Sequence, residues 1–123
     1  MYAEISALAD SGTFRAISLA KNSTNAIQFY YYSVTNSILF LVKEQGVDRA
    51  TLSYTLTNVT DYNKIALKYK QSDFALWVNG VEVDSFTNPI LMPTDLSLLN
   101  FNNGGGISPF YGKTKALKVY NQH

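Results

Sequence analysis

The chain has 123 residues, a formal net charge of +1 and no cysteine, which predicts one domain over residues 1–123 without disulfides or thiolate metal sites. Its Lys, Arg, Asp and Glu residues are scattered singly, so the basic surface that nucleic acids and anionic membranes attract is not expected. The longest mostly apolar run, residues 37–42, is too short to span a bilayer, and no signal peptide is predicted at the start.

Apolar and polar residues alternate along most of the chain, as they do in half-buried β-strands. Turn-forming Gly, Asn, Asp and Ser residues separate the alternating segments, and no segment has the pattern of a helix longer than one turn. This spacing predicts an all-β sandwich or barrel. The predicted strands are residues 2–8, 14–20, 26–32, 37–43 and 50–56, three strands within 64–86, and residues 97–101 and 110–120.

Residues 64–86 predict a three-stranded antiparallel meander. Asn79-Gly80 is the pair that best tolerates positive φ at both central positions of a two-residue type I′ turn. Such a turn fixes the register of the two strands that it joins. The residues expected opposite each other are Val78 and Val81, then Leu76 and Val83.

The only tryptophan, Trp77, lies in this meander. Alternation assigns Phe74, Leu76 and Val78 to the core face, and it assigns Trp77 and Glu82 to the reverse face. An indole on an open sheet face can stack on the apolar face of a sugar ring, or it can simply cover a neighbouring strand.

Two loops near the end of the chain contain proline or glycine. Residues 88–96 hold two of the three prolines and predict a crossing loop with one helical turn at Thr94–Leu96. Residues 102–109 are rich in glycine, and they form either a ligand-gripping loop or a flexible turn that requires positive φ at Gly104 to Gly106.

The segments "YNKIALKYKQSDFALWVNGVEV" and "LSLLNFNNGGGISPFYGKTKALKVYN" resemble the concanavalin A-like lectin/glucanase superfamily, in its laminin-G-like branch. The sequence of these segments is most similar to modules of bacteriophage tail-fibre and other virion proteins, and the resemblance extends from Tyr2 to Asn121. It implies a jelly-roll sandwich of two antiparallel sheets with the first and last strands adjacent. It also implies that the chain is a module of a longer protein, because relatives continue beyond this point.

Five residues are candidates for contact with a ligand. Trp77 is predicted on a non-core face, as are Tyr30 and Tyr32, whose alternative role is to pack against another subunit or domain. Asn102 and Asn103 offer amide donors and acceptors at the start of the glycine-rich loop.

Neither catalysis nor a metal site is expected. The glucanase relatives carry a Glu-x-Asp-x-x-Glu pattern, of which this chain has Glu82 and Asp84 but not the second Glu that a retaining glycosidase needs. No cofactor is predicted. Many laminin-G-like domains bind Ca²⁺, but the loop acids Asp10, Asp61 and Asp95 follow no calcium motif.

Two functions remain open from the sequence. The first is a non-catalytic, lectin-like module on a virion that contacts glycan on a host cell surface, as the resemblance implies. The second is a structural or decoration module that contacts other virion subunits or further copies of itself. It is motivated by the apolar residues on both faces of the strands 26–32 and 37–43.

Overall fold

The computed structural model describes residues 2–7, 15–31, 36–94, 96, 98–102, 104–105, 110 and 112–118. These residues form two five-stranded antiparallel sheets that pack face to face as a sandwich. The strands are β1 (Tyr2–Ala7), β2 (Arg15–Asn22), β3 (Asn25–Tyr31), β4 (Ser37–Glu44), β5 (Val47–Thr55), β6 (Asn63–Lys70), β7 (Asp73–Val78), β8 (Val81–Phe86), β9 (Leu98–Asn100) and β10 (Gly112–Lys118). The all-β prediction is therefore confirmed for the described part of the chain.

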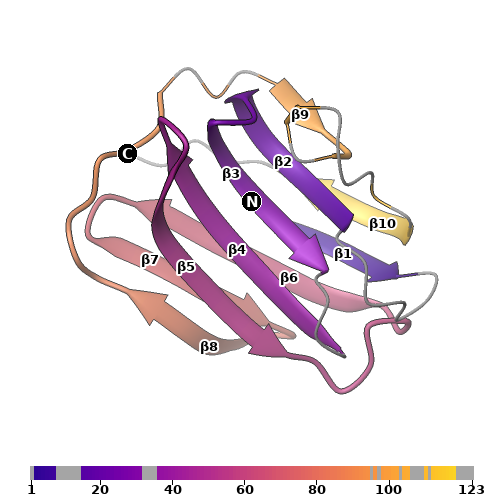
Figure 1. Ribbon diagram of the computed structural model, residues 1–123. Coiled ribbons are helices and arrows are strands. Elements are labelled where there is room, and N and C mark those ends of the chain that lie inside the picture. The colour runs from indigo at the N-terminus through magenta and orange to yellow at the C-terminus, as the bar shows by residue number, and fades with distance from the viewer. Residues whose placement is uncertain are drawn as a thin grey trace.

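The two layers differ in how local their strand connections are. Sheet A has the order β10-β1-β6-β7-β8 and lies behind sheet B in Figure 1. Sheet B has the order β5-β4-β3-β2-β9, so the strands from β2 to β5 follow one another as a meander. In sheet A, β1 lies between β10 and β6, with Tyr2 opposite both Lys118 and Ala66. No helix among the described residues is long and apolar enough to cross a membrane.

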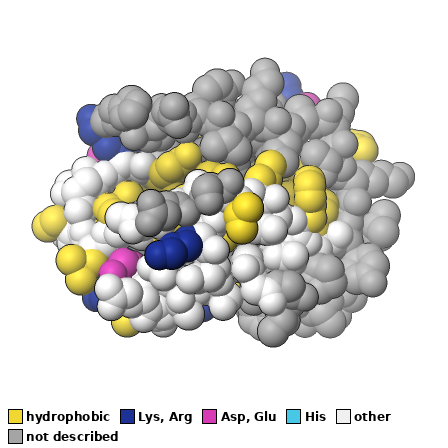
Figure 2. Space-filling view, turned by 90° about the horizontal axis from the view of Figure 1, so that it is seen from above, with side chains coloured by type: hydrophobic (Ala, Val, Ile, Leu, Met, Phe, Trp, Pro, Cys, Tyr) yellow, Lys and Arg dark blue, Asp and Glu magenta, His cyan; other side chains and the backbone are white. Residues whose placement is uncertain are grey.

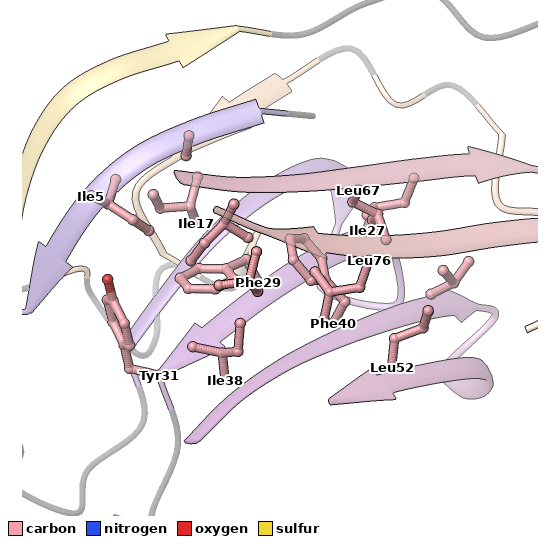
Figure 3. Packing of buried hydrophobic residues seen from close by; sticks show 14 of the residues in the cluster. Ile5, Ile17, Ile27, Phe29, Tyr31, Ile38, Phe40, Leu52, Leu67 and Leu76 are labelled. Carbon is pink, nitrogen blue, oxygen red and sulfur yellow. The ribbon is translucent and has the colours of Figure 1, made fainter. Parts of the chain in front are cut away.

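The core lies between the sheets and is built from the alternating residues that the sequence predicts. Ile27, Phe29 and Tyr31 of β3 are buried in this core, and Figure 3 shows Ile27 close to Leu67 of sheet A. The Phe29 ring packs edge-on against Tyr31, with ring centroids 5.1 Å apart. Burial of these apolar side chains is the main favourable term for a domain of this size.

The predicted hairpin at Asn79-Gly80 is confirmed, but half of its predicted register is wrong. Asn79 and Gly80 have φ values of 50° and 85°, and Val78 lies opposite Val81. Beyond that pair Leu76 lies opposite Asp84 rather than Val83, because Val83 is an extra, bulged residue of β8. Trp77 lies opposite Glu82, as expected for residues that share the reverse face.

Strand ends differ from the prediction where turns carry unanticipated residues. Gln45 and Gly46 both have positive φ and form a second tight turn, so β4 and β5 extend further toward each other than predicted. The helical turn expected at Thr94–Leu96 is wrong, since Thr94 and Leu96 are not helical and Asp95 lies outside the described residues. A single helical turn fixes several backbone dihedral angles for one hydrogen bond, so it forms only where packing supports it.

β3 is buried on both faces within a single chain. Gln28 and Tyr30, which alternate with the core residues, are buried as well. One hypothesis from the sequence was that another subunit covers this face. At β3 no partner is required, because the face is already shielded from solvent by the chain itself.

Candidate functional site

Trp77 lies on the outer face of sheet A, near the end of β7 and beside the edge strand β8. Its neighbours on β7, Leu76 and Val78, are buried in the core, whereas the indole is half-buried on the opposite side. Directly across the neighbouring strands are Ala66 of β6 and Glu82 of β8. A small side chain on one side and an exposed carboxylate on the other leave the indole accessible beside a hydrogen-bond acceptor.

Charged residues surround Trp77 without forming a single-sign patch. Lys68 and Asp73, on β6 and β7, form a 2.5 Å ion pair between Nζ and Oδ2. Lys64 on β6 and Glu82 on β8 are also exposed, on the two strands that flank β7. Because both signs are present, this face is suited to an uncharged ligand rather than to a polyanion.

The other predicted contact residues are not gathered around Trp77. Tyr30 lies in sheet B and keeps only 8% of its surface exposed, so it offers little area for stacking. Asn102 is half-buried, and its Oδ1 accepts the N–H of Gly104 at 2.8 Å, which shapes the loop locally. Tyr32 and Asn103 lie outside the described residues.

Burial raises the pKa of the Tyr30 phenol, and the negative charge of nearby Asp48 adds to this effect. Burial likewise raises the pKa of Tyr69. An unfolded chain ionises tyrosine near pH 10, so the folded state holds its proton to higher pH. The stability that these protonated tyrosines contribute is therefore fully present below about pH 10. It is lost as the pH rises through their raised pKa in the folded state.

We expect the free energy of unfolding to fall between about pH 9 and pH 11, and to fall less in Tyr30→Phe, which has no phenol to ionise. Urea denaturation at the two pH values measures the difference, with Tyr54→Phe, on an exposed tyrosine, as the control. An equal loss in the Tyr30→Phe variant and the wild-type protein would contradict the assigned role of Tyr30.

One side of the sandwich is closed by a side chain rather than by strand pairing. The edge strands β5 and β8 lie side by side in Figure 1, one from each sheet. The Asp84 carboxylate accepts the N–H of Ser53 in β5 at 2.9 Å and that of Ser85 at 2.9 Å. Asp84, one of the two acids that match the glucanase pattern, therefore links the edges of the two sheets. Glu82, the other acid, lies on the outer face of sheet A.

A groove of about 630 Å³ opens beside this link, where β5 begins and the chain leaves β8. Its volume falls within the range of about 300–1,000 Å³ that is typical of ligand sites. The residues that line the groove are Val47, Asp48, Arg49, Phe86, Asn88, Pro89, Ile90 and Leu91.

A β-bulge brings two consecutive polar residues to this groove. Val42 lies opposite Ala50, but Lys43 lies opposite Asp48, so Arg49 is the extra residue on β5. In a regular strand, neighbours such as Asp48 and Arg49 would point to opposite faces, whereas a bulge re-aims a side chain. Alternation cannot reveal this site, and its one signal in the sequence is the adjacent acid and base just after Gly46.

Arg49 is held in place by a nearly buried acid. Its Nη2 donates to Glu44 Oε1 at 2.9 Å, and the Glu44 side chain is only 11% exposed. Lys43 Nζ lies 3.9 Å from Asp48 Oδ1, and the Asp48 side chain is about half exposed. The Arg49 guanidinium is thus oriented by the protein, while the Asp48 carboxylate remains available to solvent.

The opposite wall of the groove is clamped to the β6–β7 turn. Gln71 Oε1 accepts the N–H of Ile90 at 2.9 Å, and Gln71 Nε2 donates to the Ile90 carbonyl oxygen. One side-chain amide therefore satisfies both backbone groups of Ile90, much as a strand partner would. This clamp fixes the segment that carries Asn88 and Leu91.

No group of three or more His, Cys, Asp or Glu side chains that could hold a metal ion occurs among the described residues. Asp61 is exposed in its loop, while Asp10 and Asp95 lie outside the described part of the chain.

Comparisons with protein-family models, with curated proteins and with solved structures find no match to this chain. Its class therefore rests on its own architecture, which is a two-sheet antiparallel β-sandwich.

Proposed function

We propose that this chain is a non-catalytic, lectin-like module that binds carbohydrate. We further propose that it has the jelly-roll fold of the concanavalin A-like, laminin-G-like domains. Its setting would be a bacteriophage virion protein such as a tail fibre, where it contacts glycan on the host cell surface. The resemblance of residues 62–120 to such modules motivates this setting, and the two antiparallel sheets are compatible with it.

The observation that carries the proposal is the position of Trp77. The Trp77 side chain is half-buried, so the sheet covers part of it and solvent reaches the rest. Stacking on such a ring buries the apolar C–H face of a sugar, while the adjacent Glu82 can accept a hydrogen bond from a sugar hydroxyl. Tyr30 is too buried to serve in the same way without rearrangement.

A glycan array followed by calorimetry on the best-bound glycan tests the proposal. Trp77→Ala is expected to weaken binding about tenfold or more, which is typical for an aromatic residue at the centre of an interface. Tyr62→Ala is the matched control, because Tyr62 is an exposed aromatic in a loop. Unchanged binding in Trp77→Ala would remove this site, and a protein that binds no glycan at all would refute the function.

The alternative is an assembly or decoration module with no sugar ligand. It is favoured by the apolar residues on and after the edge strand β9, where Leu98, Leu99 and Phe101 are 53%, 44% and 48% exposed. Figure 2 shows that hydrophobic side chains reach the surface on the face seen from above. Exposed apolar groups on an edge strand invite contact with another chain.

Light scattering over a range of protein concentrations tests the alternative. If β9 is an interface, the wild-type protein is expected to associate at high concentration, and Leu98→Gln with Phe101→Gln should keep it monomeric. The paired change Val81→Gln with Tyr62→Gln, on exposed residues away from β9, is the control. A wild-type protein that is monomeric throughout would argue against assembly.

A further inference from the structure

We propose that the groove between β5 and residues 86–91 is a second binding site, and that its ligand is an uncharged, polyhydroxylated chain such as a neutral glycan. The inference rests on the proposed carbohydrate-binding function, and it places the contact at a surface separate from Trp77. The groove has the volume of a ligand site and a polar floor that a bulge has brought to one side.

The charges at the groove balance one another. Lys43 and Arg49 supply two positive charges, and Glu44 and Asp48 supply two negative charges in paired contacts. An anionic ligand would meet the half-exposed Asp48 carboxylate, and a cationic ligand would meet the fixed guanidinium of Arg49. A ligand without net charge avoids both penalties.

The polar groups complement hydroxyls in particular. A sugar hydroxyl both donates and accepts hydrogen bonds, so neighbouring hydroxyls are best met by an acceptor beside a donor. Asp48 is such an acceptor, Arg49 is the adjacent donor, and the Asn88 amide on the facing wall offers both. Val47 and Leu91, which are 46% and 61% exposed, supply apolar surface for the C–H groups of the ring.

A peptide that extends sheet B along β5 is a poorer occupant of the same groove. Strand addition needs several consecutive free backbone groups along a sheet edge. Here Asp84 already accepts the N–H of Ser53, and β8 is in contact with β5. Only three residues of β5 line the groove, namely Val47, Asp48 and Arg49. This stretch is too short to pair with a stable added strand.

Amide chemical shifts and calorimetry, measured with uncharged hexasaccharides of glucose, mannose and galactose, test the inference on the whole chain. Hexagalacturonate serves as the acidic comparison. We expect a neutral hexasaccharide to shift the amides of Val47, Arg49 and Leu91. Asp48→Asn should weaken that binding about tenfold, because a hydrogen bond to a charged group is lost.

Asp48→Asn is preferred to a change at Arg49, since the Asp48 side chain is half exposed whereas removing Arg49 would leave Glu44 nearly buried without its partner. Asp61→Asn, in an exposed loop, is the matched control and should bind like the wild-type protein. Gln71→Ala should also weaken binding, because Gln71 positions the groove wall through Ile90.

The outcomes separate this inference from the proposed function. Binding that is weakened by Asp48→Asn but not by Trp77→Ala supports the groove and removes the Trp77 site. The reverse pattern overturns the groove and leaves the lectin-like function standing. Preference for hexagalacturonate, or groove shifts that follow protein concentration without any sugar, also overturns the inference, and the latter would make the groove a contact between copies.

Discussion

Leu76→Ala is expected to lower the free energy of unfolding by about 2–5 kcal/mol, because it removes a buried side chain and leaves a cavity. Leu76 is completely buried at the centre of the contact between the sheets, where Figure 3 shows it close to Phe40. Chemical denaturation monitored by circular dichroism measures the change.

Trp77→Ala is the informative comparison for Leu76→Ala, because the two residues are neighbours on β7 but occupy opposite faces. It removes the larger side chain, yet it should cost less stability, since the indole lies half-buried outside the core cluster. If Trp77→Ala unfolds the domain while Leu76→Ala is tolerated, the faces of β7 are reversed and Trp77 ceases to be a ligand candidate.

Gly104→Ala is the second substitution with a large expected effect. Gly104 has a φ of 93°, and a Cβ atom there would lie 2.8 Å from the Ala20 Cβ and 3.2 Å from the Asn22 carbonyl oxygen. Positive φ costs a non-glycine residue about 1–2 kcal/mol, and overpacking adds about 1–3 kcal/mol. We therefore expect a loss of about 2–5 kcal/mol in urea denaturation.

Gly80→Ala separates these two costs. Gly80 also has a positive φ, 85°, but a Cβ atom there would meet nothing within 4 Å. Only the backbone term applies, so the loss should be about 1–2 kcal/mol. Equal losses for the two variants would show that the loop at Gly104 moves away from β2 without penalty.

Alternation predicts the sandwich well because burial of one sheet face imposes a period of two on every strand. Ile27, Phe29 and Tyr31 lie in the core for this reason. The Asn79-Gly80 turn was equally predictable, because its positive φ values restrict the residues that can form it.

The bulges could not be predicted in the same way. The extra residues Arg49 and Val83 interrupt pairing on β5 and β8, and whether a residue is skipped depends on the partner strand rather than on its own sequence. The predicted register therefore fails at Leu76, and the groove beside Arg49 escapes sequence analysis.

The burial of Tyr30 could not be predicted from the sequence, for a related reason. Alternation correctly separates Tyr30 from the core residues Phe29 and Tyr31, but it says nothing about whether the second face of a strand is open or covered. That depends on which distant parts of the chain lie over it. Trp77 was placed better, because its two neighbours on β7 both enter the core and the outer face beside it carries Ala66 and Glu82.

The position of β1 in sheet A has a consequence for how the chain reaches its folded state. Tyr2 and Ile5 pair with Ala66 and Asn63 of β6, and the whole meander from β2 to β5 lies between them in sequence. The meander needs only short loops to close, so it can form early. Pairing of β1 with β6 closes a much longer loop, which costs more entropy and is slower. During synthesis at about 5–20 residues per second, β1 therefore spends several seconds without its partner, and the backbone groups on that edge of β6 pair only when that closure is complete.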